Sequence, residues 1–210
     1  MSSTALFFHF VLDSFAEVKN NFSKYLSSFI ALVILANLEE LYKALGGSDG
    51  DGGSIAISSA TIILTFIVSA KIILMHKKDA APNEKMIYVL VPFLLYSFYY
   101  SMFFFLGLLL FVIPGIWVLL FFSQAPLVAA LAPSSENFFK RSVKLVKKNV
   151  KLVAWISIST VVLEFLSLAF SPIADQKVRF ILTGIFSFPD AILNIILTIA
   201  GVKIFYYLNE

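Results

Sequence analysis

The sequence predicts an all-α fold: a polytopic transmembrane helix bundle of about six spans plus two amphipathic interfacial helices, in one integral membrane domain over residues 1–210. The fifty residues from Met86 to Ser135 contain no charged side chain. Apolar residues make up 60% of the chain and charged residues 14%, whereas soluble domains average about 45–50% and about 25%. A soluble chain of this length has no interior large enough for so much apolar surface.

The first expected element is an amphipathic helix over residues 4–22. At about 100° of rotation per residue, its apolar side carries Phe7, Val11, Phe15, Val18 and Phe22. Its polar side carries His9, Asp13, Glu17, Asn20 and Asn21. Two interpretations are open, since such a helix either lies in the membrane interface or packs on other protein.

Spans one and two are expected within residues 25–75. A helical span needs roughly 20 apolar residues because the hydrocarbon core is about 30 Å thick. The stretches 25–45 and 55–75 meet this requirement, and the acidic, Gly-rich segment between them is a flexible loop. Asp49 and Asp51 in this loop lack the closing Glu and the spacing of an EF-hand, so no metal is expected there.

Spans three and four are expected within the uncharged residues 87–132, where Pro114 and Gly115 form the tight turn between them. The two spans run over 87–113 and 116–132. Pro126 falls inside span four, where it frees a backbone carbonyl that a neighbouring helix must satisfy.

A second amphipathic helix is expected over residues 136–151. One side carries the apolar stripe Phe139, Val143, Val146 and Val150, and the other carries Lys140, Lys144, Lys147, Lys148 and Lys151. Residues 152–208 then hold spans five and six, over 152–170 and 186–208, joined by a loop.

The distribution of Lys and Arg predicts the orientation of the chain. If the N-terminus is cytoplasmic, thirteen of these residues fall on the inside and three, Lys43, Lys177 and Arg179, on the outside. Both ends of the chain are therefore expected in the cytoplasm.

An internal repeat is suggested by the two amphipathic segments. A shift of 128 residues aligns Ser14 with Ser142, Val18 with Val146, Lys19 with Lys147 and Asn21 with Asn149. Each segment is followed at once by a span, which makes the two units parallel repeats about an axis along the membrane normal. Two apolar segments can also match by chance.

The motif Pro114-Gly115-Ile116-Trp117, followed by Ala125-Pro126-Leu127-Val128 and by a helix with Ser142 and a closing Asn149, resembles the bacterial YciC-like membrane protein family. That family is similar to the membrane domain of glycerophosphodiester phosphodiesterases. Val143 stands where the family has Trp. The resemblance covers residues 105–150 best and implies a six-span, multi-pass protein of the bacterial inner membrane. It implies no catalysis, because the phosphodiesterase domain is absent.

The basic helix is the first candidate site. Lys140, Arg141, Lys144, Lys147, Lys148 and Lys151 are candidates for binding lipid headgroups or a partner. Each cation near an anionic membrane surface contributes about 1 kcal/mol of attraction. The alternative is that these residues only set the topology. Nucleic acid is not expected as a partner because the helix is tethered to the membrane. The expected partners are membrane lipids, a membrane protein or a second copy of the chain.

Glu164 is the second candidate, because an intramembrane carboxylate is costly and often functional. Asp190 and Asn194 lie one turn apart on span six, at roughly the same expected depth. These three residues either form a proton- or substrate-binding cluster, or a neutral Glu164 only links helices through hydrogen bonds.

The sequence contains no Cys, only two His and no glycine-rich nucleotide loop. No enzymatic activity, metal or cofactor is therefore expected. The predicted function is that of a non-catalytic inner-membrane scaffold, or a module that binds lipid or a partner through its basic amphipathic helices. The alternative is a small transporter of a lipid or small solute that uses Glu164, Asp190 and Asn194.

Overall fold

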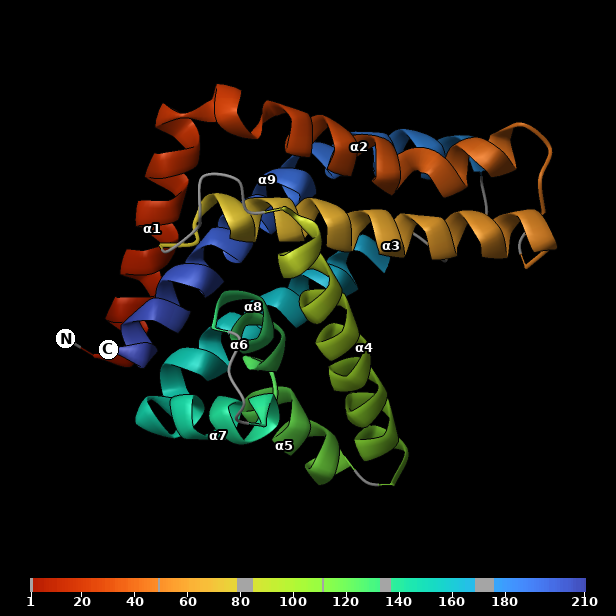
Figure 1. Cartoon of the computed structure of the whole chain (residues 1–210). Helices are drawn as coiled ribbons and strands as arrows, with labels where there is room; N and C mark the ends of the chain where they lie inside the picture. Colours follow the sequence, from red (N-terminus) through yellow and green to blue (C-terminus); the bar gives the residue numbers. More distant parts are fainter. Residues whose placement is uncertain (1, 49, 79–84, 111, 133–136, 169–175) are drawn as a thin grey trace.

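The structure is a computed structural model that describes residues 2–48, 50–78, 85–110, 112–132, 137–168 and 176–210 (Figure 1). For residues 164–168, 176 and 177 it describes the backbone alone. The elements in this part of the chain are α1 (Ser3–Asn20), α2 (Phe22–Ala44), α3 (Gly52–Met75), α4 (Ile87–Leu110), α5 (Val112–Phe121), α6 (Ala125–Leu131), α7 (Phe138–Lys148), α8 (Val150–Leu168) and α9 (Gln176–Asn209). The predicted all-α fold is confirmed.

Five segments within these residues are long and apolar enough to cross a membrane: α2, α3, α4, the pair α5 and α6 over Val112–Leu131, and α9 over Val178–Asn209. The protein is therefore a multi-pass membrane protein. α8 is apolar, but its part with described side chains, Val150–Leu163, is shorter than a span. The predicted fifth span, 152–170, thus lies partly outside the described residues.

Large apolar side chains stand on the outside of the bundle. Leu109 is 83% exposed and Ile113 is 79% exposed, at the end of the hairpin formed by α4 and α5. Such surface is costly in water but matches the hydrocarbon of a bilayer. The exposure pattern therefore agrees with a membrane environment around α4 and α5.

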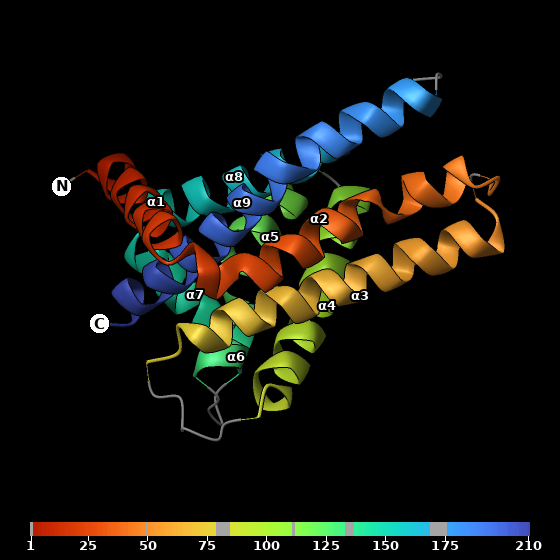
Figure 2. The same ribbon diagram turned by 90° about the horizontal axis from the view of Figure 1, so that it is seen from above.

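α9 is the central element of the bundle. Ile195 and Ile199 are buried in one apolar cluster with residues of α1, α2 and α3. Ile204 and Phe205, further along α9, are buried in a second cluster with residues of α1, α6, α7 and α8. The N-terminal half of α9 lies beside α2, while α1 crosses the end of the bundle where α9 finishes (Figures 1 and 2).

The hairpin of α4 and α5 runs in a different direction from α2 and α3 (Figure 1). α4 ends at Leu110 and α5 begins at Val112, so the predicted turn at Pro114 and Gly115 is wrong by a few residues. Both residues lie in the first turn of α5, where a proline needs no backbone N–H donor. A Cβ on Gly107 would meet the backbone N of Gly115 at 2.8 Å, so glycine permits the close approach of the two helices.

The fourth predicted span is not one continuous helix. α5 stops at Phe121 and α6 starts at Ala125, with Pro126 in the first turn of α6. Proline in a first helical turn loses no hydrogen bond, whereas it would disrupt a helix that ran through it. The break therefore falls just before Pro126.

The sixth predicted span begins earlier than expected. Residues 176–183 belong to α9 instead of a loop, because Val178, Phe180 and Ile181 continue the apolar pattern without a breaker. Pro189 lies inside the same helix.

The two halves of the chain share their local structure. A single asparagine separates α1 from α2 and α7 from α8, at Asn21 and Asn149 respectively. The packing differs, because α2 lies along α9 whereas α8 makes no such contact with α3 in the described part of the chain. The repeat is thus visible within each unit but not in the way the units pack together.

Candidate functional site

α7 begins with a side-chain cap. The Asn137 side-chain oxygen accepts hydrogen bonds from the backbone N–H groups of Phe139 and Lys140, at 3.0 and 3.3 Å. This cap satisfies donors that have no partner within the helix. The cap thus fixes the start of α7 at Phe138. Residues 133–136, which precede Asn137, lie outside the described part of the chain.

One face of α7 packs on the bundle through Ser142, Leu145 and Val146, all of them buried. The expected apolar stripe is thus partly wrong, because Val150 is exposed and Leu145 is buried in its place. The rings of Phe138 and Phe139 add contacts to Tyr96 and Phe103 of α4 and to Phe122, which directly follows α5.

Two polar residues of α7 form hydrogen bonds with the ends of α5 and α6, the two helices of the interrupted fourth span. The Ser142 hydroxyl donates to the backbone oxygen of Phe121, the last residue of α5, at 2.7 Å. Arg141 donates to the oxygen of Ala132 after α6 and to the Asn209 side chain at the end of α9, at 3.3 and 3.0 Å. Arg141 therefore fastens three elements together, unlike the lysines beside it. Carbonyls at helix ends lack intrahelical donors, so these bonds stabilise the break.

The opposite face of α7, continued into the first turn of α8, carries lysines. Five of them are exposed: Lys140, Lys144, Lys147, Lys148 and Lys151. We call these five residues the lysine face. The exposure of these five residues agrees with their helical spacing in the sequence, while their role as a binding site stays a prediction.

Asn149 joins α7 to α8. Its side-chain oxygen accepts from the Leu152 backbone N–H at 3.1 Å, as a helix cap does, and from the Ser3 hydroxyl at 2.9 Å. The start of α1 is thereby attached to this joint. Trp155 of α8 reinforces the attachment by donating to the Thr4 hydroxyl at 3.2 Å and by stacking on Phe7.

A cluster of ionisable groups lies where α1 meets the ends of α3 and α9. Glu17 accepts hydrogen bonds from the Tyr25 hydroxyl at 2.9 Å and lies 2.8 Å from His76 and 3.0 Å from Lys203. Lys203 also pairs with Asp13. The sequence places Glu17 on the polar side of α1 but does not indicate the cluster, because its members are distant along the chain.

The pKa of Glu17 shows how firmly this carboxylate is held. Burial alone would raise the pKa, but hydrogen bonds from Lys203, His76 and Tyr25 outweigh it and lower the pKa to about 2. Glu17 is therefore ionised at neutral pH.

A second polar group ties α2, α3 and α9 together at the other end of the bundle. Arg179 pairs with Glu40 at 2.8 Å, and Lys43 pairs with Glu39 and Glu40. The Ser58 hydroxyl donates to Glu39 at 3.0 Å. These contacts link α2 to α3 and to α9.

The intramembrane candidates are not brought together by any described contact. Asp190 and Asn194 are half-buried on α9, and their side chains form no hydrogen bond within the part of the chain that the structure describes. Glu164 lies in α8, but its side chain falls outside the described residues. The predicted cluster thus stays a prediction.

Comparison of the chain with protein-family models, with curated proteins and with solved structures finds no match.

Proposed function

We propose that the protein is a non-catalytic, multi-pass scaffold of the bacterial inner membrane, of the YciC-like type, that binds anionic lipid headgroups through α7. The observation that carries this proposal is the lysine face, whose five side chains are exposed while the opposite side of the same helix is fixed to the bundle.

The rigidity of α7 supports a binding role. A helix whose lysines served only to determine the membrane topology would need its positive charges. It would not need a fixed orientation relative to the rest of the bundle. α7 instead has a cap at Asn137, a buried face and the bonds of Ser142 and Arg141 to the ends of α5, α6 and α9. These contacts hold the lysine face as a preorganised surface, and each cation near anionic lipid adds about 1 kcal/mol.

Lipid analysis of the purified protein tests the proposal. We expect replacement of the five lysines by Gln to reduce co-purifying anionic phospholipid, relative to zwitterionic phospholipid, by at least about tenfold. A variant with Arg at the same five positions is the matched control, since it keeps the charge and should keep the lipid. High salt should weaken the retention in the wild type. Equal anionic lipid in the Gln variant and the wild type would contradict the proposal.

One observation favours transport as a second candidate function. Gln124, in the break between α5 and α6, is 3% exposed, and its side-chain oxygen has no hydrogen-bond partner among the described groups. Interrupted helices with polar groups in the membrane are typical of transporter binding sites.

Glu164→Gln separates the two functions. A scaffold in which Glu164 only bonds helices should keep its stability and its effect in cells, whereas Glu164→Leu should cost about 1 kcal/mol of helix association. A transporter that uses this carboxylate should lose its activity in the Gln variant while remaining folded. A gene-deletion phenotype and its complementation by each variant provide the measurement.

A further inference from the structure

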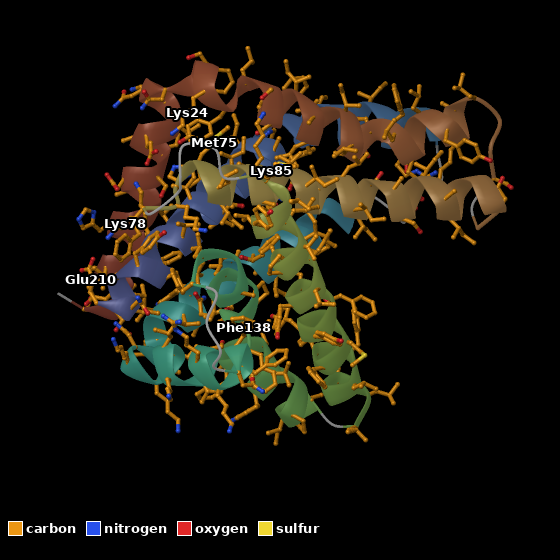
Figure 3. The ribbon with its side chains drawn as sticks, in the orientation of Figure 1. Lys24, Met75, Lys78, Lys85, Phe138 and Glu210 are labelled. Atoms are coloured by element: carbon orange, nitrogen blue, oxygen red, sulfur yellow. The ribbon has the colours of Figure 1, made fainter. Side chains whose placement is uncertain are left out.

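Two carboxylates hold the C-terminal half of α1 to the bundle: Asp13 pairs with Lys203, and Glu17 has a wider set of partners. Glu17 of α1 contacts groups from three other elements: Tyr25 at the start of α2, His76 at the end of α3 and Lys203 near the end of α9. Figure 3 shows the same end of the bundle with Lys24, Lys78 and Glu210 labelled around it.

The geometry around His76 suits a ring that donates from both nitrogens. Nδ1 lies 2.8 Å from the backbone oxygen of Ile72, which can only accept, so Nδ1 carries a proton. Nε2 lies 2.8 Å from the carboxylate of Glu17, which is ionised and also only accepts. A neutral histidine has a single N–H and would place a lone pair against one of these oxygens.

The Tyr25 hydroxyl cannot compensate for a lost proton. It lies 2.9 Å from Glu17 and 3.1 Å from Nε2 of His76, and it has one proton to donate. If His76 is neutral, this proton serves either the carboxylate or the ring. If the hydroxyl donates to the ring, Lys203 is the remaining donor to Glu17 within this cluster. If the hydroxyl donates to Glu17, the lone pair on Nε2 of His76 faces the carboxylate and repels it.

Other charged groups lie near this cluster. Lys203 and Asp13 form an ion pair beside Glu17, and Lys24 lies over the Tyr25 ring at 5.5 Å. α4 and α6, which also pack on α3, contain no charged residue. Histidine is the side chain whose charge changes between about pH 5 and 8.

We propose that Glu17 and His76 form a proton-dependent clasp that keeps the C-terminal half of α1 on the bundle when His76 is doubly protonated and loosens it when His76 is neutral. The clasp closes as pH falls and opens as pH rises. α1 has a second apolar stripe, Phe8, Leu12 and Phe15, that is exposed. Loosening would leave the N-terminal attachment at Asn149 in place and let this stripe move within the membrane interface.

Hydrogen–deuterium exchange of the full-length protein in nanodiscs tests the clasp. We expect amide exchange over residues 12–20, corrected for intrinsic rates, to be about tenfold faster near pH 7.5 than near pH 5.5, because a hydrogen bond to a charged group is lost. Residues 3–8 should change much less, since their attachment has no titratable group. A wild-type profile over residues 12–20 that does not change with pH would by itself overturn the proposal.

Three variants assign the pH dependence to its groups. His76→Gln should abolish it, because Gln does not titrate. Glu17→Gln should also abolish it, since an amide can turn either its oxygen or its nitrogen toward Nε2. His9→Gln is the matched control: His9 is the other histidine, exposed on α1, and its loss should leave the pH dependence intact. Retained pH dependence in either His76→Gln or Glu17→Gln, or its loss in His9→Gln, would overturn the clasp.

Discussion

Ser142 and Ser14 occupy corresponding positions of the two repeats, and both are 0% exposed. Their hydroxyls nevertheless differ in what they stabilise. Ser142 donates to the Phe121 carbonyl on another helix, where no intrahelical donor is available. Ser14 donates to the Phe10 carbonyl, four residues back in its own helix, which already accepts a helix bond.

Alanine at the two serines should therefore have unequal effects. We expect Ser142→Ala to leave the Phe121 carbonyl without a donor and to cost about 1–3 kcal/mol of stability. Ser14→Ala, at an equally buried site, should cost less than about 0.5 kcal/mol. Thermal unfolding of both variants in the same detergent provides the comparison. Equal losses of stability in the two variants would mean that the hydrogen bond from Ser142 to the Phe121 carbonyl does not stabilise the protein.

We expect Asp51 to make the stability of the protein depend on pH in the acidic range. It caps α3 by accepting from the Ser54 backbone N–H at 2.7 Å, and it accepts from the Tyr42 hydroxyl at 2.8 Å. These bonds, with those from Ser48, lower the pKa of Asp51 to about 2. Because the pKa is lower in the folded state, the stabilisation is complete above the unfolded value of about 3.9 and is lost as pH falls through about 2.

The measurement compares the melting temperatures of the wild type and Asp51→Asn between pH 6 and pH 3. Asn keeps an oxygen acceptor for the cap but has no charge to titrate. We expect the wild type to lose more stability than the variant over this range. The difference between the two curves isolates Asp51 from the other carboxylates, and parallel curves would contradict the assignment.

The helices themselves follow from local sequence, but the contacts of single residues do not. The lysine face was predictable because lysines recur at helical spacing around a packed side, and the apolar stretches of α2, α3 and α4 are long enough to define spans. Arg141 could not be separated from the lysines, since its partners Ala132 and Asn209 are distant in sequence. His76 likewise meets Glu17 only through folding, across 59 residues of chain.

The hairpin of α4 and α5 shows how glycine sets the distance between two elements. A Cβ at Gly107 would lie 2.8 Å from the Gly115 backbone N and 2.9 Å from its Cα, and neither atom can move without displacing the helix. At Gly201 of α9 the nearest atom to such a Cβ is a Leu127 side-chain carbon at 3.7 Å, which is ordinary contact.

Gly107→Ala should therefore force α4 and α5 apart, with an expected cost of about 1–3 kcal/mol. Gly201→Ala is the matched control and should be neutral or slightly stabilising, because alanine favours the helix over glycine. Unfolding measured by circular dichroism in detergent checks both variants. A fully stable Gly107→Ala protein would show that the two helices are not in close contact.

The two ends of the whole molecule constrain the number of crossings. Lys203, near the C-terminus, pairs with Asp13 and Glu17 near the N-terminus, and the two ends lie close together in Figure 1. Chain ends on one side of a membrane require an even number of spans. Five segments qualify by length within the described residues, so two ends on one side would call for one further crossing. α8, with 19 residues, falls in the range of about 17–25 that a span requires.

We therefore expect six spans with both ends in the cytoplasm, as the distribution of Lys and Arg indicates. The loop before Asp51 lies at the end of α2 and α3 opposite to His76, so reporters fused after Gly50 and after Lys78 should report outside and inside. A fusion at the C-terminus should report inside if α8 crosses the membrane, and outside if it does not. The Gly50 fusion controls for orientation, because an inside signal there would invert the whole topology. An outside C-terminus with a correct Gly50 signal would instead remove α8 from the spans and separate the two chain ends that Lys203 joins.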